Sequence, residues 1–216
     1  MKILTYLICL FICCSANANS KSTAFVRFIK GKAIILREQK EITIVKDMEV
    51  TEKDIIKTSK KSFVLIKFPD AVSIKIDSRS KVKLESFKKD FHVKIEKGSS
   101  FFKIDKKREN PFKVETRSMS LAVRGTTFFT SHDLGSQRSW TCVKEGVVDI
   151  ISIDGKEKIE LNQGLGISAD KDHGISTPSL LQWTKNLNWS FNESEDSLNK
   201  VGTDVIQNSY HHIDYE

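Results

Sequence analysis

Apolar and charged residues alternate one by one along much of the chain after residue 24. In Val72–Ile76, for example, the apolar residues are separated by Ser73 and Lys75. Because successive side chains of a strand point to opposite faces of a sheet, this pattern predicts strands with one buried and one solvent-exposed face. The same alternation recurs in three further segments, at 81–85, 91–96 and 112–115.

Shorter apolar runs extend this series, at 24–28, 33–36, 42–45, 63–68, 147–151 and 159–161. Strand starts recur about every 8–13 residues, which is typical of sandwiches, barrels and β-solenoids. No segment between residues 24 and 170 has a helical period. We therefore predict an all-β fold of many short antiparallel strands, arranged either as a two-layer sandwich or as a β-solenoid-like wound sheet.

Residues 1–18 have the features of a cleavable signal peptide. A positive charge at Lys2 precedes an apolar run that is too short to span a bilayer, and a small-x-small pattern ends at Ala18. Cys13 and Cys14 raise the alternative of a lipid anchor, but neither follows the small residue typical of a lipidated cysteine. We predict cleavage after Ala18 and export to the periplasm or the medium, with no transmembrane segment in the mature chain.

The mature chain divides into a β domain at 24–170 and an acidic C-terminal tail at 171–216, with a short helix near 179–189. Residues 53–108 carry 17 Lys and Arg against 7 Asp and Glu, whereas residues 170–216 carry 3 against 8. The lysines fit the solvent faces of alternating strands or, alternatively, a basic face for anionic partners. A tail that folds back on this basic face is a further hypothesis. Export and the lack of an aromatic stacking motif argue against nucleic acid.

Residues with catalytic or metal-binding chemistry are few and scattered. Cys142 alone remains after cleavage of the signal, in a setting typical of a buried thiol. His132 and Asp133 follow what reads as the end of a strand, and on an extended chain adjacent side chains point apart. Metal binding is a weak alternative for two further groups: Asp170, Asp172 and His173, and His211 and His212. Because no hydrolase, metalloprotease or nucleotide-binding motif occurs, we predict no enzymatic activity, no catalytic residues, no cofactor and no metal.

Several segments, in order, resemble the motifs of one family. Asp54–Thr58 is similar to "G-D-x-I-x-T" and Ser62–Ala71 to "S-x-x-x-L-x-F-x-D-G", although two of the motif glycines are replaced. Ala122–Phe128 is close to "A-x-x-G-T-x-F", and Val143–Val148 matches "V-x-E-G-x-V". Over about residues 24–168, the chain resembles the FecR domain, named for a periplasmic signalling protein.

The resemblance implies an all-β extracytoplasmic domain with no known enzymatic activity. Founding members relay a signal from an outer-membrane receptor to a cytoplasmic sigma factor through a transmembrane helix. A chain with a cleavable signal lacks that connection, so we do not expect direct regulation of a sigma factor. The family-motif residues are expected to be structural: Arg124, Gly125, Thr126, Phe128, Gly146 and Gly164. Gly125 is expected at a bend or β-bulge, where Gly125→Val would abolish folding.

The expected function is that of an exported, non-enzymatic FecR-type binding or signalling module of a bacterial envelope. Its partner would be an envelope protein or an anionic envelope polymer. The alternative is a periplasmic lipid or lipopolysaccharide carrier of the β-jellyroll type. A carrier needs an apolar groove open to solvent, whereas a binding module is filled by its own side chains. An enzyme would require His132, Asp133 or Cys142 to converge in a pocket.

Overall fold

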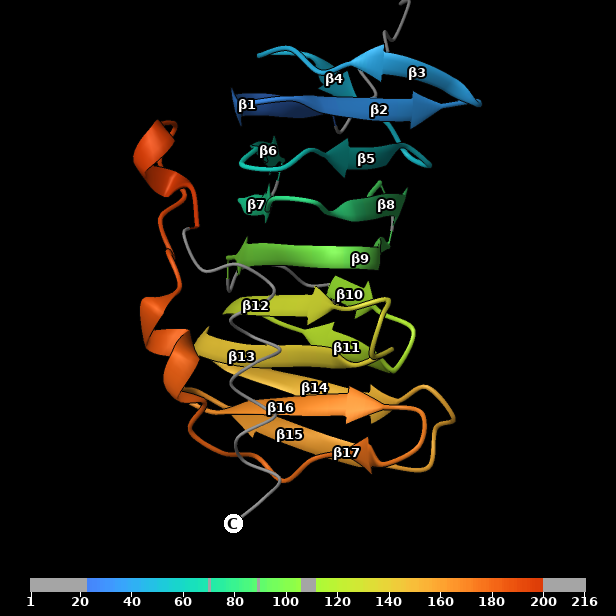
Figure 1. Cartoon of the computed structure of the whole chain (residues 1–216), viewed down its shortest axis with the longest axis vertical. Helices are drawn as coiled ribbons and strands as arrows, with labels where there is room; N and C mark the ends of the chain where they lie inside the picture. The colour runs from blue at the N-terminus through green and yellow to red at the C-terminus, as the bar shows by residue number, and fades with distance from the viewer. Residues whose placement is uncertain (1–22, 70, 89, 106–111, 200–216) are drawn as a thin grey trace, which may run out of the picture.

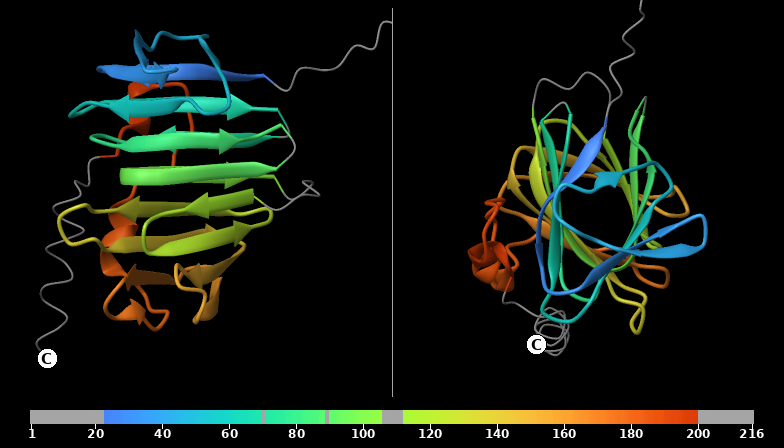
Figure 2. Two further views of the ribbon diagram at one scale, coloured as in Figure 1. Left: turned by 90° about the vertical axis from the view of Figure 1, so that its right-hand side faces the viewer. Right: turned by 90° about the horizontal axis from the view of Figure 1, so that it is seen from above.

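The computed structural model describes residues 23–69, 71–88, 90–105 and 112–199. Their strands are stacked along the longest axis of the molecule (Figure 1), and the view from above shows that the stack has two layers (Figure 2). The described residues form seventeen strands and two short 3-10 helices, which confirms the all-β prediction.

The two layers are sheets that share one long strand. Sheet A contains, in spatial order, β4 (Glu49–Val50), β1 (Ala24–Lys30), β6 (Phe63–Phe68), β7 (Val72–Ile76), the second half of β9 (Phe91–Ile104), β12 (Thr127–His132), β13 (Ser139–Glu145), β16 (Gly166–Asp170) and β17 (Gly174–Ile175). Sheet B contains β3 (Lys40–Thr43), β2 (Ala33–Arg37), β5 (Ile55–Thr58), β8 (Lys81–Ser86), the first half of β9, β10 (Phe112–Glu115), β11 (Met119–Val123), β14 (Val147–Ser152) and β15 (Lys158–Asn162). All of these pairs are antiparallel except β9 and β10, which are parallel, so this one pair differs from the prediction.

The chain passes repeatedly from one sheet to the other through sharp bends. In β9, residues up to Lys97 pair within sheet B, and residues from Gly98 onward pair within sheet A. Gly98 has a φ of 81°, a left-handed conformation that glycine adopts without steric cost. Other bends between the sheets also carry a residue with a positive φ: Gly31, Asp47, Lys53, Lys61, Arg79, Gly125, Gly146 and Gly164. The architecture is therefore two-layered, and it is wound back and forth between the layers.

The bend within β9 and the bend between β11 and β12 lie at opposite ends of the strands of sheet A. Gly98 pairs with His132, the last residue of β12, whereas Gly125 lies just before the first residue of β12. At this second position the hydroxyl of Thr126 donates to the carbonyl of Val147 at 3.0 Å, which ties the β11–β12 bend to the next one. The switch places the bends of β12, β13 and β16 on the side where β9 ends.

The inward-facing residues of both sheets form one continuous buried cluster. Its aromatic members pack within and across the layers. Phe102 stacks on its sheet A neighbour Phe128 with ring centroids 4.8 Å apart, and Phe91 lies 4.3 Å from its sheet B neighbour Phe112. Phe102 also lies 5.7 Å from Phe112, which joins the two layers. All four rings are at most 2% exposed. Burial of each such side chain contributes about 2–3 kcal/mol. The space between the sheets is thus occupied by the protein's own side chains.

The outer face of sheet A is covered by residues 176–199, which we call the strap. The strap runs along the stack from its C-terminal end toward β1 (Figures 1 and 2). It contains the 3-10 helices η1 (Gln182–Asn186) and η2 (Glu195–Ser197), and η1 lies inside the segment where a short helix is predicted.

Among the residues described, no helix is long and apolar enough to cross a membrane. The predicted signal peptide at residues 1–18 lies outside the described residues, as do His211 and His212.

Candidate functional site

Apolar residues fasten the lower part of the strap to sheet A. The outward-facing side chains of Phe101, Phe129, Trp140 and Cys142 form a second buried cluster with strap residues Leu181, Trp183 and Leu187. Phe129 packs edge-on against Trp183 at 5.8 Å, and Phe101 packs against Trp189 at 5.5 Å. The strap therefore buries an aromatic row that would otherwise face solvent.

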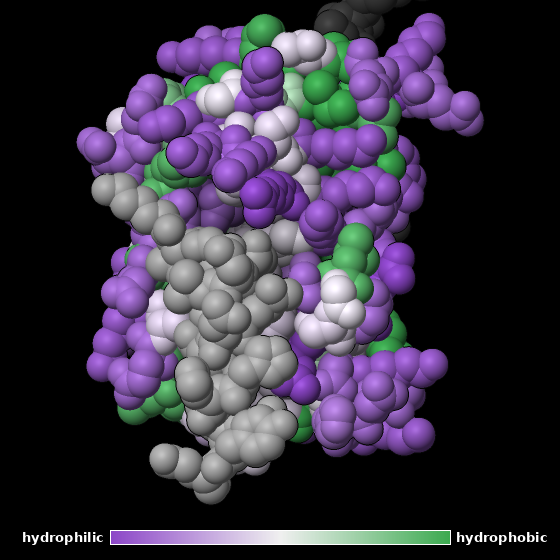
Figure 3. Space-filling view, viewed as in Figure 1, coloured by the Kyte–Doolittle hydropathy of each residue, from purple (hydrophilic) through white to green (hydrophobic). Residues whose placement is uncertain are grey.

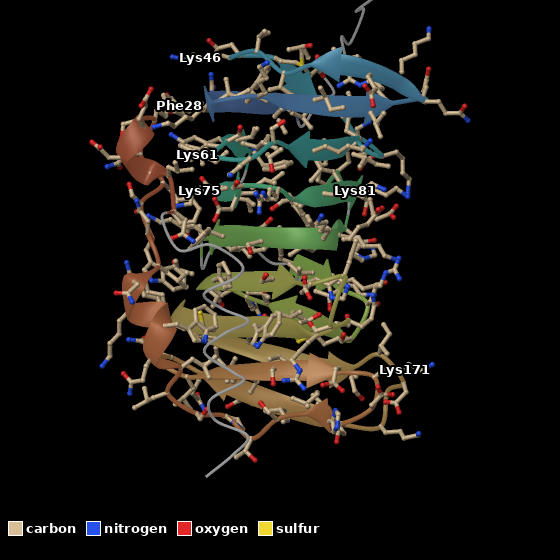
Figure 4. All side chains as sticks on the ribbon, viewed as in Figure 1. Phe28, Lys46, Lys61, Lys75, Lys81 and Lys171 are labelled. Carbon is tan, nitrogen blue, oxygen red and sulfur yellow. The ribbon has the colours of Figure 1, made fainter. Side chains whose placement is uncertain are left out.

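A buried lysine fastens the upper part of the strap. Lys75 lies on the outer face of β7 and is 1% exposed, and Figure 4 shows it on the side of the stack where the strap runs. Its ammonium donates to the carbonyls of Asn188, Ser190 (2.8 Å) and Ser197 (3.0 Å). It also lies 4.2 Å from the centre of the Phe101 ring, close enough for a cation–π interaction. Burial lowers the pKa of Lys75 to about 8, and the charge of Asp77 opposes this shift.

Asp77 is a second buried charged group under the strap. It is 5% exposed, and its carboxylate accepts a hydrogen bond from the backbone N–H of Ser78 at 2.8 Å. Burial raises the pKa of Asp77 to about 6, although hydrogen bonds from Ser78 and the side chain of Asn199 and the charge of Lys75 favour the ionised form. Lys75 and Asp77 together give the outer face of sheet A a polar centre that only the strap completes.

Two ion pairs join the acidic part of the strap to sheet A. Glu193 lies 2.7 Å from the Lys67 ammonium, and Glu195 lies 2.7 Å from that of Lys30. Both pairs are partly exposed, so each contributes about 0–1 kcal/mol. These contacts agree with the hypothesis that the acidic tail folds back on a basic face.

A groove with a volume of about 900 Å³ lies beside the strap on the outer face of sheet A. Its floor is one cross-strand row, in which the strand register places Lys67, Ser73, Lys103 and Thr127 next to one another. Strap residues 189–192 line the side toward the strap. The remaining lining residues come from hairpins, strand ends and bends: Ala71, Ile104, Asp105, Gly125, Thr126, Lys144, Glu145, Gly146 and Gln163.

A β-bulge brings two charged residues to the end of this row. The register between β12 and β13 shifts because Thr127 pairs with Glu145 while Phe128 pairs with Val143. Lys144 is the extra residue, and both Lys144 and Glu145 line the groove. Bulges commonly redirect side chains in this way next to binding sites.

The family-motif residues lie in several different environments. Gly125, Thr126 and Gly146 meet at the groove, where a Cβ on Gly146 would lie 3.0 Å from the Gly125 carbonyl oxygen. Phe128 is buried in the core. The other two are Arg124, which is exposed in the β11–β12 bend, and Gly164, whose surroundings leave space for a Cβ. The sequence motif thus shapes the bends that border the groove.

Several charges on the outer face of sheet B form ion pairs among the described residues. Glu115 lies 3.1 Å from Lys113, 3.5 Å from Lys94 and 3.3 Å from His92. Similar pairs cover the neighbouring strands, such as Lys81–Glu96 and Lys83–Glu85. Figure 3 shows how hydrophilic residues dominate the surface that the described residues form in that view.

The groups considered for catalysis do not converge. Phe129 pairs with Cys142 and His132 pairs with Ser139, so His132 and Cys142 are an odd number of positions apart and lie on opposite faces of sheet A. His132 is the buried last residue of β12, and its Nδ1 lies 3.0 Å from the Ser139 hydroxyl. Burial raises the pKa of the Cys142 thiol, which opposes formation of a thiolate.

The acidic residues near His173 also serve local contacts. Asp170 lies 3.0 Å from Arg138 and 2.9 Å from His173. Within the described ranges, no group of three or more His, Cys, Asp or Glu side chains is arranged to hold a metal ion.

Sequence reasoning did not find the groove or Lys75. The alternation in Val72–Ile76 places Lys75 on a solvent face, and nothing local to β7 shows that the strap covers it. A signal does exist in the neighbouring strands. Phe63–Phe68 and Thr127–His132 are buried on nearly every position, which indicates that both faces of these strands are covered.

The fold and its strapped face define an all-β, two-layered scaffold, and known proteins are similar to it. A family model described as "FecR protein" matches residues 54–149, from the start of β5 into β14. The resemblance seen in the motifs is therefore confirmed over residues 54–149, which match the FecR domain.

Two solved structures have a similar fold. They are crystal structures at 1.65 and 2.50 Å resolution of a candidate anti-sigma factor from Parabacteroides distasonis ATCC 8503. Each has a TM-score of 0.53 and 19% sequence identity over 61% of this chain. The matched region spans 63% and 62% of those chains, and at this identity the likeness concerns the fold alone. No curated protein sequence matches the chain.

Proposed function

We propose that this protein is an exported, non-enzymatic FecR-type module that binds a macromolecular partner in a bacterial envelope and acts in signalling or scaffolding. The partner is an envelope protein or an anionic envelope polymer, and it engages the strapped face of sheet A. The FecR domain supports a signalling role, since the family and the anti-sigma factor fold neighbours are associated with signalling.

The observation that carries this proposal is the contrast between the filled interior and the hollowed outer face. A lipid carrier needs an apolar hollow between its sheets. Here the inward-facing residues form one continuous cluster, whereas the groove on sheet A has a mixed lining of lysines, hydroxyl groups, amides, two carboxylates and two aromatic rings. The contrast favours the binding module over the carrier.

Retention of envelope material on the immobilised mature chain, residues 19–216, tests this proposal. Wild-type protein and a Lys94→Ala/Lys113→Ala variant, altered on sheet B, should retain the same macromolecule. A Lys67→Ala/Lys103→Ala/Lys144→Ala variant, altered on the strapped face, should lose it. Retention of lipid alone, or equal retention by all three proteins, would refute the proposal.

A further inference from the structure

Two lysines of the groove have no ionic partner. Lys103 and Lys144 are exposed, and no carboxylate of the described residues lies within ion-pair distance of either ammonium. Lys67, the third lysine of the groove, pairs with Glu193. On sheet B, by contrast, lysines such as Lys113 are held by glutamates. Among the described residues, Lys103 and Lys144 are thus two of several lysines without an ion pair, and they are the two that line the groove.

The three lysines stand on alternate strands. Lys67 is on β6, Lys103 on β9 and Lys144 on β13, with β7 and β12 between them. Because neighbouring strands lie about 4.8 Å apart, the lysines recur at about 10 Å along the groove. This interval is comparable with the length of a disaccharide unit.

The other lining groups suit sugars. Trp189 and Phe191 of the strap line the groove and are partly buried, and the C–H groups of a pyranose can pack on aromatic rings. Lys144 lies 5.8 Å from the centre of the Trp189 ring, so a lysine and an aromatic ring of the groove are next to each other. The hydroxyl groups of Ser73 and Thr127 line the floor, together with the amides of Gln163 and Asn192. Hydroxyl and amide groups both donate and accept hydrogen bonds, as sugar hydroxyls do.

An extended peptide fits this site less well. Peptides that join a sheet form backbone hydrogen bonds with an exposed strand edge. The floor of the groove is instead the face of a sheet, where the backbone groups of β7, β9 and β12 pair with neighbouring strands. Only side chains are offered to a ligand.

The carboxylates in the lining also discriminate between ligands. Asp105 and Glu145 lie among the lysines, and Glu145 accepts a hydrogen bond from Thr127 at 3.4 Å. A polymer with an anionic group on every unit would place charge against these carboxylates. In a polymer whose charges are spaced apart, the anionic groups would pair with the lysines. Its hydroxyl groups would donate hydrogen bonds to the carboxylates of Asp105 and Glu145.

From these features we infer that the groove binds a linear acidic polysaccharide with about one anionic group per disaccharide. This inference rests on the proposed function, because it requires export to the envelope, and it assigns the partner class as a glycan.

Calorimetric titration of the purified chain, residues 19–216, tests the inference. The probes are a hyaluronate octasaccharide with a carboxylate on alternate rings, a neutral maltooctaose and an octaglutamate peptide. The hyaluronate fragment should bind, and maltooctaose should not bind measurably. Octaglutamate should bind at least about tenfold more weakly than hyaluronate.

Matched variants assign binding to the groove. Lys103→Ala/Lys144→Ala should weaken hyaluronate binding about tenfold or more, whereas Lys94→Ala/Lys113→Ala, with the same change in net charge, should change it less than about twofold. Trp189→Ala should weaken binding and Trp189→Phe should restore most of it. The urea midpoint of each variant shows whether the strap and the sheets remain folded.

No binding of hyaluronate, equal binding of octaglutamate, or equal losses in the two double-lysine variants would overturn the inference. These outcomes leave the proposed function intact if envelope material is still retained on the strapped face. Loss of that retention in every protein would refute the proposed function itself.

Discussion

The strands of sheets A and B have the same alternation of apolar and polar residues, yet the environments of their outer faces differ. On sheet B, Lys83 pairs with Glu85 at the surface. On sheet A, Lys75 occupies an equivalent outward position and is buried beneath the strap. The difference shows that alternation reports only which side chains point outward. What they meet there depends on a segment more than 100 residues further along the chain.

The two faces also handle charge differently. Charges on sheet B remain near water, and several of them, such as those of Lys83 and Glu85, pair with side chains of opposite sign. The ammonium of Lys75 is withdrawn from water, which is costly unless hydrogen bonds replace its hydration. Three backbone carbonyls of the strap supply that replacement.

The largest expected effect comes from Gly98→Ala, because Gly98 joins the two faces within one strand. A Cβ at this position would lie 2.6 Å from the Ser80 Cα, and the φ of 81° is strained for alanine. Together these effects should lower the free energy of unfolding by about 3 kcal/mol or more. Urea denaturation measures the change.

Gly164→Ala is the matched control for this substitution. Gly164 has a similar φ of 83°, but nothing lies within 4 Å of a Cβ built there. The cost should be limited to backbone strain of about 1–2 kcal/mol. Equal losses in the two variants would show that the close approach at Gly98 is unimportant.

The next largest effect is a difference in the stability cost of removing a lysine from sheet A and from sheet B. Lys75→Met removes the donor for three strap carbonyls and should lower the free energy of unfolding by about 2–4 kcal/mol. Lys83→Met on sheet B should cost about 0–1 kcal/mol. Limited proteolysis should cleave the strap faster in Lys75→Met only. Unchanged strap protection in that variant would contradict the role assigned to Lys75.

The pH dependence of stability should have opposite signs on the two faces. Burial raises the pKa of Asp77 from its ordinary 3.8 to about 6, so between these values the folded protein holds a proton that the unfolded chain has released. Stability contributed by Asp77 therefore falls as pH rises through this window. Relative to Asp77→Asn, the wild type should lose about 1–3 kcal/mol between pH 4 and 6.5 in urea titrations.

Glu115 on sheet B provides the opposite case. Burial alone would raise its pKa, but the hydrogen bond and charge of Lys113 and the charge of Lys94 lower it below the ordinary 4.5. Its contribution is present above that value and is lost as pH falls through the lowered pKa. The difference between wild type and Glu115→Gln should thus shrink on acidification. The same sign for both residues would contradict the contrast between the faces.

The smallest expected effect concerns the surface ion pair between the strap and sheet A. Glu193→Gln should lower the free energy of unfolding by about 0.5 kcal/mol, because the pair with Lys67 is partly exposed. The loss should vanish in 1 M salt, where charges are screened within about 3 Å. Glu96→Gln, which breaks the Lys81 pair on sheet B, should behave alike. A loss above about 2 kcal/mol would mean that Glu193 does more than form a surface pair.

Much of the fold was predictable because it follows from local pattern. Strands such as Val147–Ser152 alternate strictly between exposed and buried positions, as expected for sheet B. The family motifs then identified the FecR domain from its glycines and the strands beside them. The local pattern could not distinguish a sandwich from a solenoid, because the path of the chain between the two sheets depends on which strands each bend connects.

The candidate site was not predictable for the same reason. Its floor combines β6, β7, β9 and β12, and its wall is the strap, so it exists only once distant segments are brought together. Lys103 and Lys144 look like any other lysine of the chain in sequence. Their lack of ionic partners is a property of the assembled surface.

The attachment of the strap to Lys75 has an evolutionary consequence. The lysine binds main-chain carbonyls, which every amino acid possesses, so this contact places no demand on the side chains at Asn188, Ser190 or Ser197. The side chains at these positions bond within the strap instead: the Asn188 amide donates to the carbonyls of Asp196 and Leu198, and the hydroxyls of Ser190 and Ser197 lie 3.0 Å apart. On the side of sheet A, selection for this one contact would fall on the codon of Lys75 in β7.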